Sequence, residues 1–190
     1  MIKLLLASQS PRRKQLLAQL GVVVETVSPD IDEAPLPNEL PYLYVARMSE
    51  AKAAKGLEMS QSTLPVIASD TSVCVDEHIL GKPEDKADGI KMLTMLSGRK
   101  HQVMTSVTLL NNGQAQTMVS VSDVWFTVLS KADKDAYWET GEPLDKAGGY
   151  AIQGLAARYI TRLEGSYSGV MGLPLFETSE LLKGLNSHET

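Results

Sequence analysis

The sequence predicts an α/β protein built on a mixed β-sheet. Segments of strand and helix composition alternate irregularly along the 190 residues, and a hairpin signal, Asn111-Asn112-Gly113, lies between two of the strands. A doubly wound parallel sheet would need a helical crossover at that point instead. The chain is 43% hydrophobic and 22% charged, as ordinary globular proteins are, so disordered and fibrous structures are not expected.

The elements of the first half follow from local composition. An apolar run at the start ends in a polar turn, where Pro11 can open a helix that Gly21 can end. Prolines and acids crowd residues 29–41 and indicate a loop, the best candidate for a lid or lobe boundary. In chain order we expect a strand over 2–7, a helix from 11 to 20, a strand over 22–27, this loop, a helix over 41–59, and a buried strand over 66–75 interrupted at 69–71.

Turn and capping signals divide the second half of the chain. Ser130 can cap a helix, and Pro174 can open the last one. The expected elements are a turn at 76–78, a helix over 84–96, strands over 101–110 and 119–129 around the hairpin turn, a helix over 130–140, a glycine-bearing loop over 148–154, a strand over 158–163, and a helix from 172 to 185.

Cysteine content and net charge limit the cellular location and the classes of partner that we expect. Cys74 is the only cysteine, so no intramolecular disulfide can form, and a reducing cytoplasm fits best. The net charge of −5 argues against a general nucleic-acid binder, although it leaves room for a local basic site. The first apolar run is too short for a signal peptide or for a membrane span, which needs about 20 apolar residues. We therefore expect one cytoplasmic domain over residues 1–190, with no membrane and no nucleic-acid partner.

The polar turn that begins at Ser8, together with Arg12 and Arg13, has the chemistry of a phosphate cradle. A helix N-terminus attracts anions, and hydroxyl and guanidinium groups add hydrogen bonds and charge. Basic residues in a first helical turn oppose the helix dipole, so a purely structural helix start would favour acids. The alternative is a capped helix with a solvated basic turn.

Asp70 is the second candidate, in a hydroxyl-rich segment of a buried strand. A carboxylate at the end of an apolar strand lies where α/β proteins bind ligands, and it could bind a divalent metal or accept a proton from water. An ordinary turn aspartate is the alternative. Glu33, Lys52 and Lys82 could supply further charges around a triphosphate. Lys52 could equally extend from an apolar helix face to solvent, and Lys82 could be an ordinary turn lysine.

Several familiar site classes lack support. Neither the glycine-rich phosphate loop of kinase-like NTPases nor a dinucleotide fingerprint is present. Residues 165–169 resemble the nucleophile elbow of serine hydrolases, but Tyr167 stands where the serine should be. The three histidines are too far apart for the local spacing of zinc ligands and are expected in the core or on the surface.

Seven short motifs, in order along the chain, resemble those of the Maf-like nucleoside triphosphate pyrophosphatases. Each motif alone is weak, but the ordered set is specific and spans nearly the whole chain. The set is most similar to the branch of dTTP/UTP pyrophosphatases. The motifs are Ala7-Ser8-Gln9-Ser10-Pro11-Arg12-Arg13, Asp32-Glu33, Ala51-Lys52-Ala53, Ser69-Asp70-Thr71, Gly81-Lys82-Pro83, KAGGYAIQG at 146–154, and Gly172-Leu173-Pro174.

The resemblance implies an elongated mixed β-sheet with flanking helices and two lobes around a cleft, similar to the inosine triphosphate pyrophosphatase architecture. It implies hydrolysis of a nucleoside triphosphate to the monophosphate and pyrophosphate with Mg²⁺ or Mn²⁺, and a homodimer as a family expectation. By analogy Asp70 accepts the proton and, with Glu33, holds the metal, while Lys52 and Lys82 take part in catalysis. The residues that would line the phosphates are Ser8, Arg13, Lys52 and Lys82.

By the same resemblance, Arg12, Thr71 and Gln153 occupy positions that select the base. A glutamine amide offers one donor and one acceptor, which match the carbonyl and N–H groups of uracil and thymine. The sister branch that cleaves 7-methyl-GTP tends to have an aromatic residue, a glutamine and an acid there, which suit a cationic guanine. We therefore expect cleavage of dTTP and UTP. The alternatives are a pyrophosphatase for 7-methyl-GTP or another modified nucleotide, and a nucleotide-sensing regulator of cell division.

Overall fold

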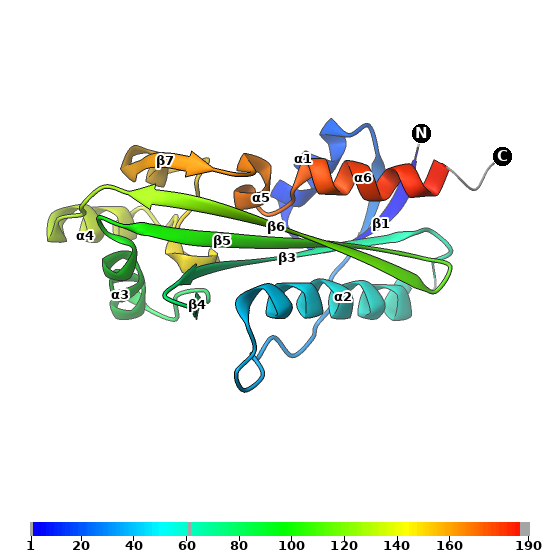
Figure 1. The fold of residues 1–190 in the computed structure, drawn as a ribbon, viewed down its shortest axis with the longest axis horizontal. Helices are drawn as coiled ribbons and strands as arrows, with labels where there is room; N and C mark the ends of the chain where they lie inside the picture. Colours follow the sequence, from blue (N-terminus) through cyan, green and yellow to red (C-terminus); the bar gives the residue numbers. More distant parts are fainter. Residues whose placement is uncertain (1, 61, 187–190) are drawn as a thin grey trace.

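A computed structural model describes residues 2–60 and 62–186 of the chain. A mixed sheet of seven strands forms the long axis of the described molecule (Figure 1). Its main path runs β2-β1-β3-β5-β6-β7, and β4 pairs with β3 off this path. The strands are β1 (Lys3–Ala7), β2 (Val23–Val27), β3 (Val66–Val75), β4 (His78–Leu80), β5 (Lys100–Asn111), β6 (Gln114–Phe126) and β7 (Ile160–Glu164).

Parallel pairing occurs at the N-terminal end of this sheet. β1 pairs in parallel with both β2 and β3, whereas β3, β5, β6 and β7 follow one another antiparallel. The β5–β6 hairpin turns on Asn112 and Gly113, whose φ angles of 50° and 76° suit a tight two-residue turn. The predicted mixed sheet and its central hairpin are confirmed.

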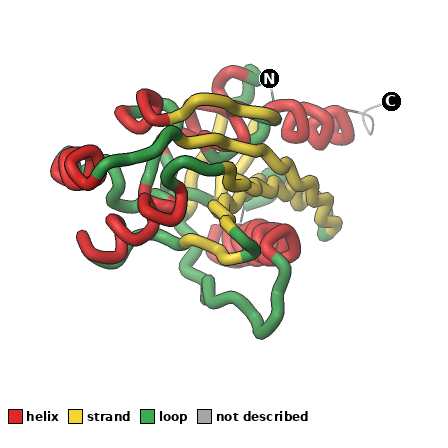
Figure 2. Tube along the Cα trace, turned by 60° about the vertical axis from the view of Figure 1, so that its left-hand side comes forward, coloured by secondary structure: helices red, strands yellow, loops and turns green. Residues whose placement is uncertain are grey.

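Helices cover the sheet in two groups (Figures 1 and 2). At the end of the sheet that contains β1 and β2, α1 and α6 lie on one face and α2 on the opposite face, while α3 and α4 gather at the other end. No helix among the described residues is long and apolar enough to cross a membrane. The helices are α1 (Pro11–Gln19), α2 (Pro41–Ser60), α3 (Lys86–Leu96), α4 (Lys131–Glu139), α5 (Tyr167–Met171) and α6 (Leu175–Asn186), with 3₁₀ turns at Ala147–Gly149 and Leu155–Tyr159.

The helices at the two ends of the sheet pack on separate hydrophobic clusters, which divides the molecule into two lobes, and α2 packs on two smaller clusters. One core joins β1, α1 and α6 and includes Leu6, Leu17 and Leu182. The other lies beside α3 and α4 and includes Leu93 and Tyr137. Because β3, β5 and β6 contribute to both cores, a continuous sheet connects the lobes. The predicted elongated α/β architecture with two lobes is confirmed.

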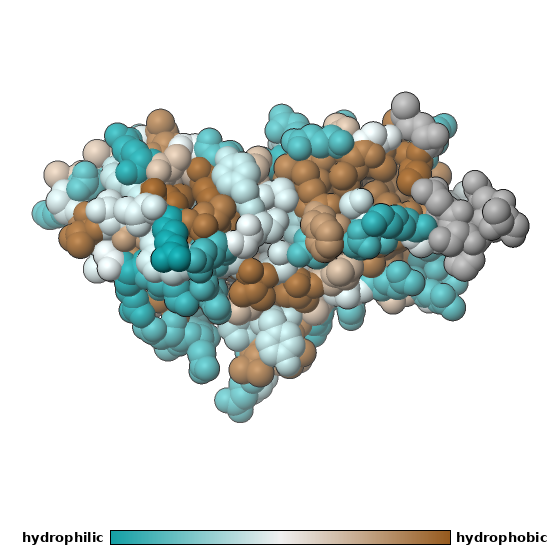
Figure 3. Space-filling model, turned by 45° about the horizontal axis from the view of Figure 1, so that its top comes forward, coloured by the Kyte–Doolittle hydropathy of each residue, from teal (hydrophilic) through white to brown (hydrophobic). Residues whose placement is uncertain are grey.

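The lobe of α1 and α6 also presents apolar surface, seen on the right of the space-filling view (Figure 3). On α6, Phe176 is 69% exposed. Scattered exposed apolar side chains are normal in folded proteins. The homodimer expected for the family stays a prediction.

The long helix α2 approaches β1 closely at Gly56. A Cβ at this position would be 2.7 Å from the Cβ of Ala7, closer than side-chain atoms tolerate. Val45, Met48 and other buried residues recur at helical spacing and turn one face of α2 toward the sheet. Lys52 follows Met48 by four positions, about one helical turn, and its side chain is mostly covered.

The predicted interruption of β3 at 69–71 is wrong. The strand is continuous because its hydroxyl side chains find partners: the Ser69 hydroxyl lies 2.7 Å from the carbonyl oxygen of Ser106 and 2.9 Å from that of Gly172. β5 also pairs with β3 through this stretch, where Asp70 faces Ser106 in the ladder. Asp70 therefore lies in the middle of a strand rather than at its end.

Other boundaries differ from expectation for local reasons. β6 begins at Gln114, before the predicted position 119, because the two-residue turn places Gln114 directly opposite Asn111. It ends at Phe126 rather than at 129. The turn predicted at 76–78 reverses the chain into the unpredicted strand β4, since Asp76 and Glu77 adopt φ angles of 49° and 63°. The short helix α5 was also not predicted.

Candidate active site

The candidate site lies where one edge of β3 is open. β1 pairs with this edge only as far as Ile67, and β4 takes up the same edge from Val73. None of the described strands covers the stretch between them, which contains Asp70 and Thr71. A cavity of about 680 Å³ opens over this stretch, within the usual size range of small-molecule sites. The gap in the sheet edge thus creates the space for a ligand.

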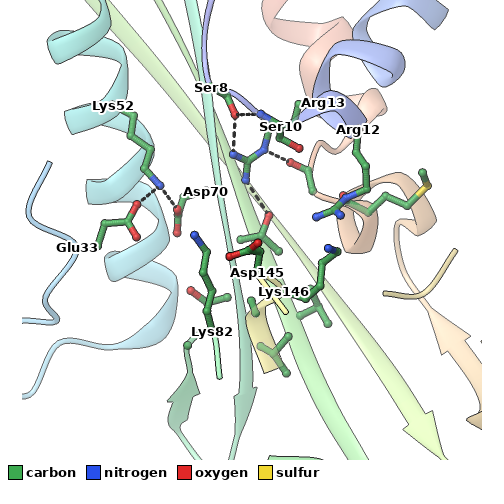
Figure 4. A pocket seen from close by; sticks show the side chains of 18 of the residues that line it. Ser8, Ser10, Arg12, Arg13, Glu33, Lys52, Asp70, Lys82, Asp145 and Lys146 are labelled. Carbon is green, nitrogen blue, oxygen red and sulfur yellow. Dashed lines mark hydrogen bonds and ion pairs between the residues drawn. The ribbon is translucent and has the colours of Figure 1, made fainter. Parts of the chain in front are cut away.

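Arg13 is fixed in the cavity by three partners, of which Thr71 and Gly172 are distant in the sequence (Figure 4). Its Nε donates to the carbonyl of Gly172 at 2.8 Å, and its terminal nitrogens donate to the hydroxyls of Ser8 at 3.2 Å and Thr71 at 3.4 Å. Burial lowers the pKa of Arg13, and the nearby charge of Asp70 opposes that shift. Because its direct partners are neutral, Arg13 presents a positive charge in a set direction beside the N-terminus of α1, where anions are favoured.

Lys52 lies between two carboxylates at one end of the cavity, which we call the carboxylate end (Lys52, Glu33 and Asp70; Figure 4). Its Nζ is 2.6 Å from Oε1 of Glu33 and 2.7 Å from Oδ1 of Asp70. The side chains of Lys52 and Asp70 are 13% and 11% exposed, whereas that of Glu33 is 50% exposed. The Tyr44 hydroxyl holds the loop of Glu33 by donating to the Glu33 carbonyl at 2.9 Å.

The pKa of Glu33 reflects this arrangement. Partial burial acts to raise the pKa, but the hydrogen bond from Lys52 and the charges of Lys52, Lys82 and Arg13 outweigh burial. The net result is a pKa below the ordinary value for a glutamate. The Glu33 carboxylate is therefore held in its charged form, as a ligand for a cation must be.

Three cations line the rest of the cavity, which we call the cation end (Arg12, Lys82 and Lys146), and Lys82 lies where the two ends meet, since its charge also acts on Glu33. Arg12 Nε donates to the carbonyl of Met171 at 3.3 Å. No carboxylate of the described residues lies within 4.0 Å of the charged nitrogens of these three side chains. Burial lowers the pKa of Lys146, and the like charge of Arg12 lowers it further. This end therefore has an excess of positive charge.

A backbone hydrogen bond joins the two loops that carry Lys82 and Lys146. The N–H of Gly148 donates to the carbonyl of Gly81 at 2.9 Å. Gly148 has a φ of 67°, and a Cβ there would lie 2.8 Å from the Cβ of Val73. Only glycine fits this position, and it brings together two lysines that are far apart in the sequence.

Glu33 and Asp70 fit a divalent cation that is shared with a phosphorylated ligand. Both carboxylates converge on one point, which the ammonium of Lys52 occupies. The described part of the chain contains no group of three or more acidic, histidine or cysteine side chains that could hold a metal alone. Mg²⁺ commonly takes one or two carboxylates and completes its shell with water and substrate phosphates. Two carboxylates suffice in that mode of binding.

Comparison with known proteins places the chain in a family. Residues 3–185 match the family model described as Maf-like protein. The chain belongs to the Maf-like family. It is 50% identical over 182 residues to the dTTP/UTP pyrophosphatase of Vibrio vulnificus, covering 96% of this chain and 98% of that protein. It is 49% identical over 188 residues to the dTTP/UTP pyrophosphatase of Photobacterium profundum, covering 96% of each.

Among solved structures, the nucleoside-triphosphatase / dITP/XTP pyrophosphatase of Mycobacterium abscessus aligns with a TM-score of 0.45 and 17% identity. The alignment covers 66% of this chain and 74% of that chain.

In this Maf-like protein, nearly all the predicted site residues line the same cavity. Gln153 is the exception: it is exposed and lies outside the lining, so its part in base selection stays a prediction. The predicted residues that line the cavity are Ser8, Arg12, Arg13, Glu33, Lys52, Asp70, Thr71 and Lys82.

Three further cavity residues, Tyr44, Asp145 and Lys146, were not predicted as site residues. Lys146 is the first residue of the family motif at 146–154, and its membership of that motif could have identified it as a site residue. Asp145 adopts a φ of 59°, a left-handed conformation that aspartate tolerates better than most residues. Tyr44 lies in a helix whose composition gives no sign of a site, because its role depends on the loop folded against it.

Behind the cavity wall, His101 supports Tyr150. The His101 side chain is buried, and its Nε2 lies 2.7 Å from the Tyr150 hydroxyl oxygen. Burial lowers the pKa of His101 to about 4, so the ring is neutral near pH 7. Tyr150 lines the cavity two residues after Gly148. The buried pair thus anchors the loop of the cation end, and His101 is a core histidine.

Proposed function

We propose that this Maf-like protein hydrolyses dTTP and UTP to the nucleoside monophosphate and pyrophosphate with the aid of a divalent cation. The observation that carries the proposal is the presence, in one cavity, of the fixed carboxylate Asp70 and three cations without carboxylate partners among the described residues. Relatives that match nearly the whole chain are named dTTP/UTP pyrophosphatases, which supports the same substrates. The choice of Mg²⁺ or Mn²⁺, the single domain over 1–190 and the cytoplasmic location stay predictions.

Asp70 would accept the proton of the attacking water. Water is a poor nucleophile at neutral pH, and a carboxylate that takes its proton lowers the barrier. A divalent cation, when bound by Glu33 and Asp70, would acidify the water and offset phosphate charge. Attack at the α-phosphorus expels pyrophosphate. Arg13 and Lys82 are already in place to stabilise the charge that develops, without the reorganisation that water would need, and Lys146 would bind the phosphates equally before and during the reaction.

The proposed choice of a pyrimidine base depends on Arg12, Thr71 and Gln153. Thr71 is held on both sides, because its hydroxyl accepts hydrogen bonds from Arg13 at 3.4 Å and from the Thr105 hydroxyl at 3.1 Å. The Gln153 amide complements the edge of uracil or thymine. Since Gln153 lies outside the cavity lining, its contact with the base requires that the base extend beyond that lining.

A nucleotide panel with identified products tests the proposed reaction. Purified protein with Mg²⁺ receives dTTP, UTP, CTP, GTP and 7-methyl-GTP in separate assays, and the products are quantified. We expect pyrophosphate and the monophosphate in equal amounts, formed fastest from dTTP and UTP. A preference for 7-methyl-GTP, release of orthophosphate with a nucleoside diphosphate, or nucleotide binding without turnover would each contradict the proposal.

The variant Gln153→Glu tests base selection in the same panel. Loss of the amide donor and the added negative charge should lower kcat/KM for UTP and dTTP about tenfold, the cost of one mispaired polar group. Gln114→Glu, on the exposed β5–β6 hairpin, is the matched control and should behave as wild type. If the kinetics of Gln153→Glu match wild type on UTP, dTTP and 7-methyl-GTP, Gln153 does not select the base.

A further inference from the structure

The ammonium of Lys52 occupies the point at which the carboxylates of Glu33 and Asp70 converge. Its Nζ lies 2.6 Å from one carboxylate and 2.7 Å from the other. The side chain of Lys52 comes from α2, that of Asp70 from β3 and that of Glu33 from the loop before α2, so three separate segments meet at a cation (Figure 4). The position suited to a divalent cation is therefore filled by a cation of the protein itself.

Two carboxylates this close together repel one another unless a positive charge lies between them. Lys52 supplies that charge in the free protein, and its side chain is only 13% exposed, so water screens the contacts weakly. A divalent cation bound to the same two oxygens would be repelled by an ammonium at ion-pair distance. Lys52 and the divalent cation therefore compete for the same carboxylates.

We propose that Lys52 excludes the divalent cation from the free enzyme and releases the carboxylates to it only when a triphosphate binds. The inference rests on the proposed function, because the triphosphate is the anion that draws Lys52 away. A lysine side chain has a flexible four-carbon stem, so its ammonium can turn from the carboxylates to a phosphate without movement of α2. Lys52 is then a positioning residue that couples metal binding to nucleotide binding.

Binding of Mn²⁺ to the nucleotide-free protein tests this coupling without any measurement of turnover. Calorimetry or the paramagnetic resonance signal of free Mn²⁺ reports the dissociation constant for wild type, Lys52→Met and the control Lys55→Met. Lys55 lies on the same helix, about one turn further on, and its ion-pair partner among the described residues is Glu58 at the surface. Each substitution removes one positive charge and keeps a similar side-chain length.

We expect Lys52→Met to bind Mn²⁺ about tenfold or more tightly than wild type, because two close carboxylates lose their internal cation. Lys55→Met should bind as wild type does. Adding Glu33→Gln to Lys52→Met should remove the gain, which shows that the metal binds at these carboxylates. Equal or weaker Mn²⁺ binding by a folded Lys52→Met protein, checked by circular dichroism, would overturn the proposal.

A second measurement keeps the test valid if Lys52→Met does not fold. Wild-type protein is titrated with Mn²⁺ in the presence and absence of a non-hydrolysable α,β-imido analogue of UTP, with correction for Mn²⁺ bound by free analogue. The analogue should tighten Mn²⁺ binding by the protein about tenfold or more, and an unchanged affinity would overturn the coupling. Failure of the proposed function would appear separately, as absence of pyrophosphate release by wild type.

Discussion

The two ends of the cavity differ in how their charges are balanced. At the carboxylate end, Lys52 meets Glu33 and Asp70 at ion-pair distance, and each of the three groups has a partner within the protein. At the cation end, none of the described carboxylates lies within 4.0 Å of Lys82 or Lys146. The carboxylate end is organised before a ligand arrives, whereas the cation end reaches charge balance only with an anion.

This difference shows how one cavity can orient a triphosphate. A cluster of like charges raises the local concentration of an anion and favours the pose that neutralises the cluster. The phosphate chain is therefore expected to lie along the cation end and to present one phosphorus to Asp70. Asp70 at the carboxylate end is thus assigned to the chemistry and Lys146 at the cation end to binding, so substitutions of these two residues should have different kinetic signatures.

The largest expected effect is that of Asp70→Asn at the carboxylate end. Loss of the proton acceptor should lower kcat by about 10² to 10⁴, while KM for UTP changes little because the cation end is intact. Steady-state kinetics of pyrophosphate release measure both parameters. Asp76→Asn, an exposed aspartate paired with Arg99, is the matched control. A kcat of Asp70→Asn within twofold of wild type would show that Asp70 is not the base.

A smaller effect, on KM rather than on kcat, is expected from Lys146→Met at the cation end. Loss of one charge-assisted contact should raise KM for UTP about tenfold to a hundredfold and affect kcat less. The dependence of KM on salt concentration should also weaken, since one fewer cation attracts the substrate. Lys91→Met, on the exposed surface of α3, should leave both quantities unchanged. If Lys146→Met lowers kcat alone, the division between the two ends is incorrect.

The smallest effect concerns the scaffold behind the cation end. The pKa of His101 falls from 6.5 to about 4 in the folded protein, so the unfolded chain binds more protons between these values. The free energy of unfolding should therefore decrease as pH falls through this range. His101 alone should lower it by about 2 kcal/mol between pH 7 and pH 5.

Denaturant unfolding of two variants at pH 7 and pH 5 isolates this contribution. The pH dependence should be reduced in His101→Gln, which cannot titrate, and retained in His78→Gln, whose histidine is exposed. Equal pH dependence in both variants would contradict the expected role of His101.

Much of the candidate site could be predicted because its residues belong to short motifs with local chemistry. Ser8 and Arg13 follow a strand and open a helix, and both line the cavity. Lys52 was predicted to supply charge around a triphosphate, and its side chain lines the cavity. Such features depend on a few neighbouring residues, so sequence pattern is enough to identify them.

Features that depend on distant partners could not be predicted in the same way. The hydroxyl-rich segment around Asp70 looked like a break in β3 because its partner Ser106 is unknown from local sequence. The loop of Lys146 lies beside the loop of Lys82 because the N–H of Gly148 donates to the carbonyl of Gly81. These two glycines are far apart in the sequence. Pairing of loops across the sheet thus decides which cations share a site.

β3 belongs to both lobes at once, and this limits how the molecule can move. Its ladder with β5 runs without a break from Val66 to Cys74, and Asp70 lies near the middle of it (Figure 1). A large rotation of one lobe against the other would strain these hydrogen bonds. The loops around the cavity are not tied into the ladder, so they can change shape at a lower cost in free energy. Under the proposed function, Asp70 is the fixed point to which those loops would bring the reacting phosphorus.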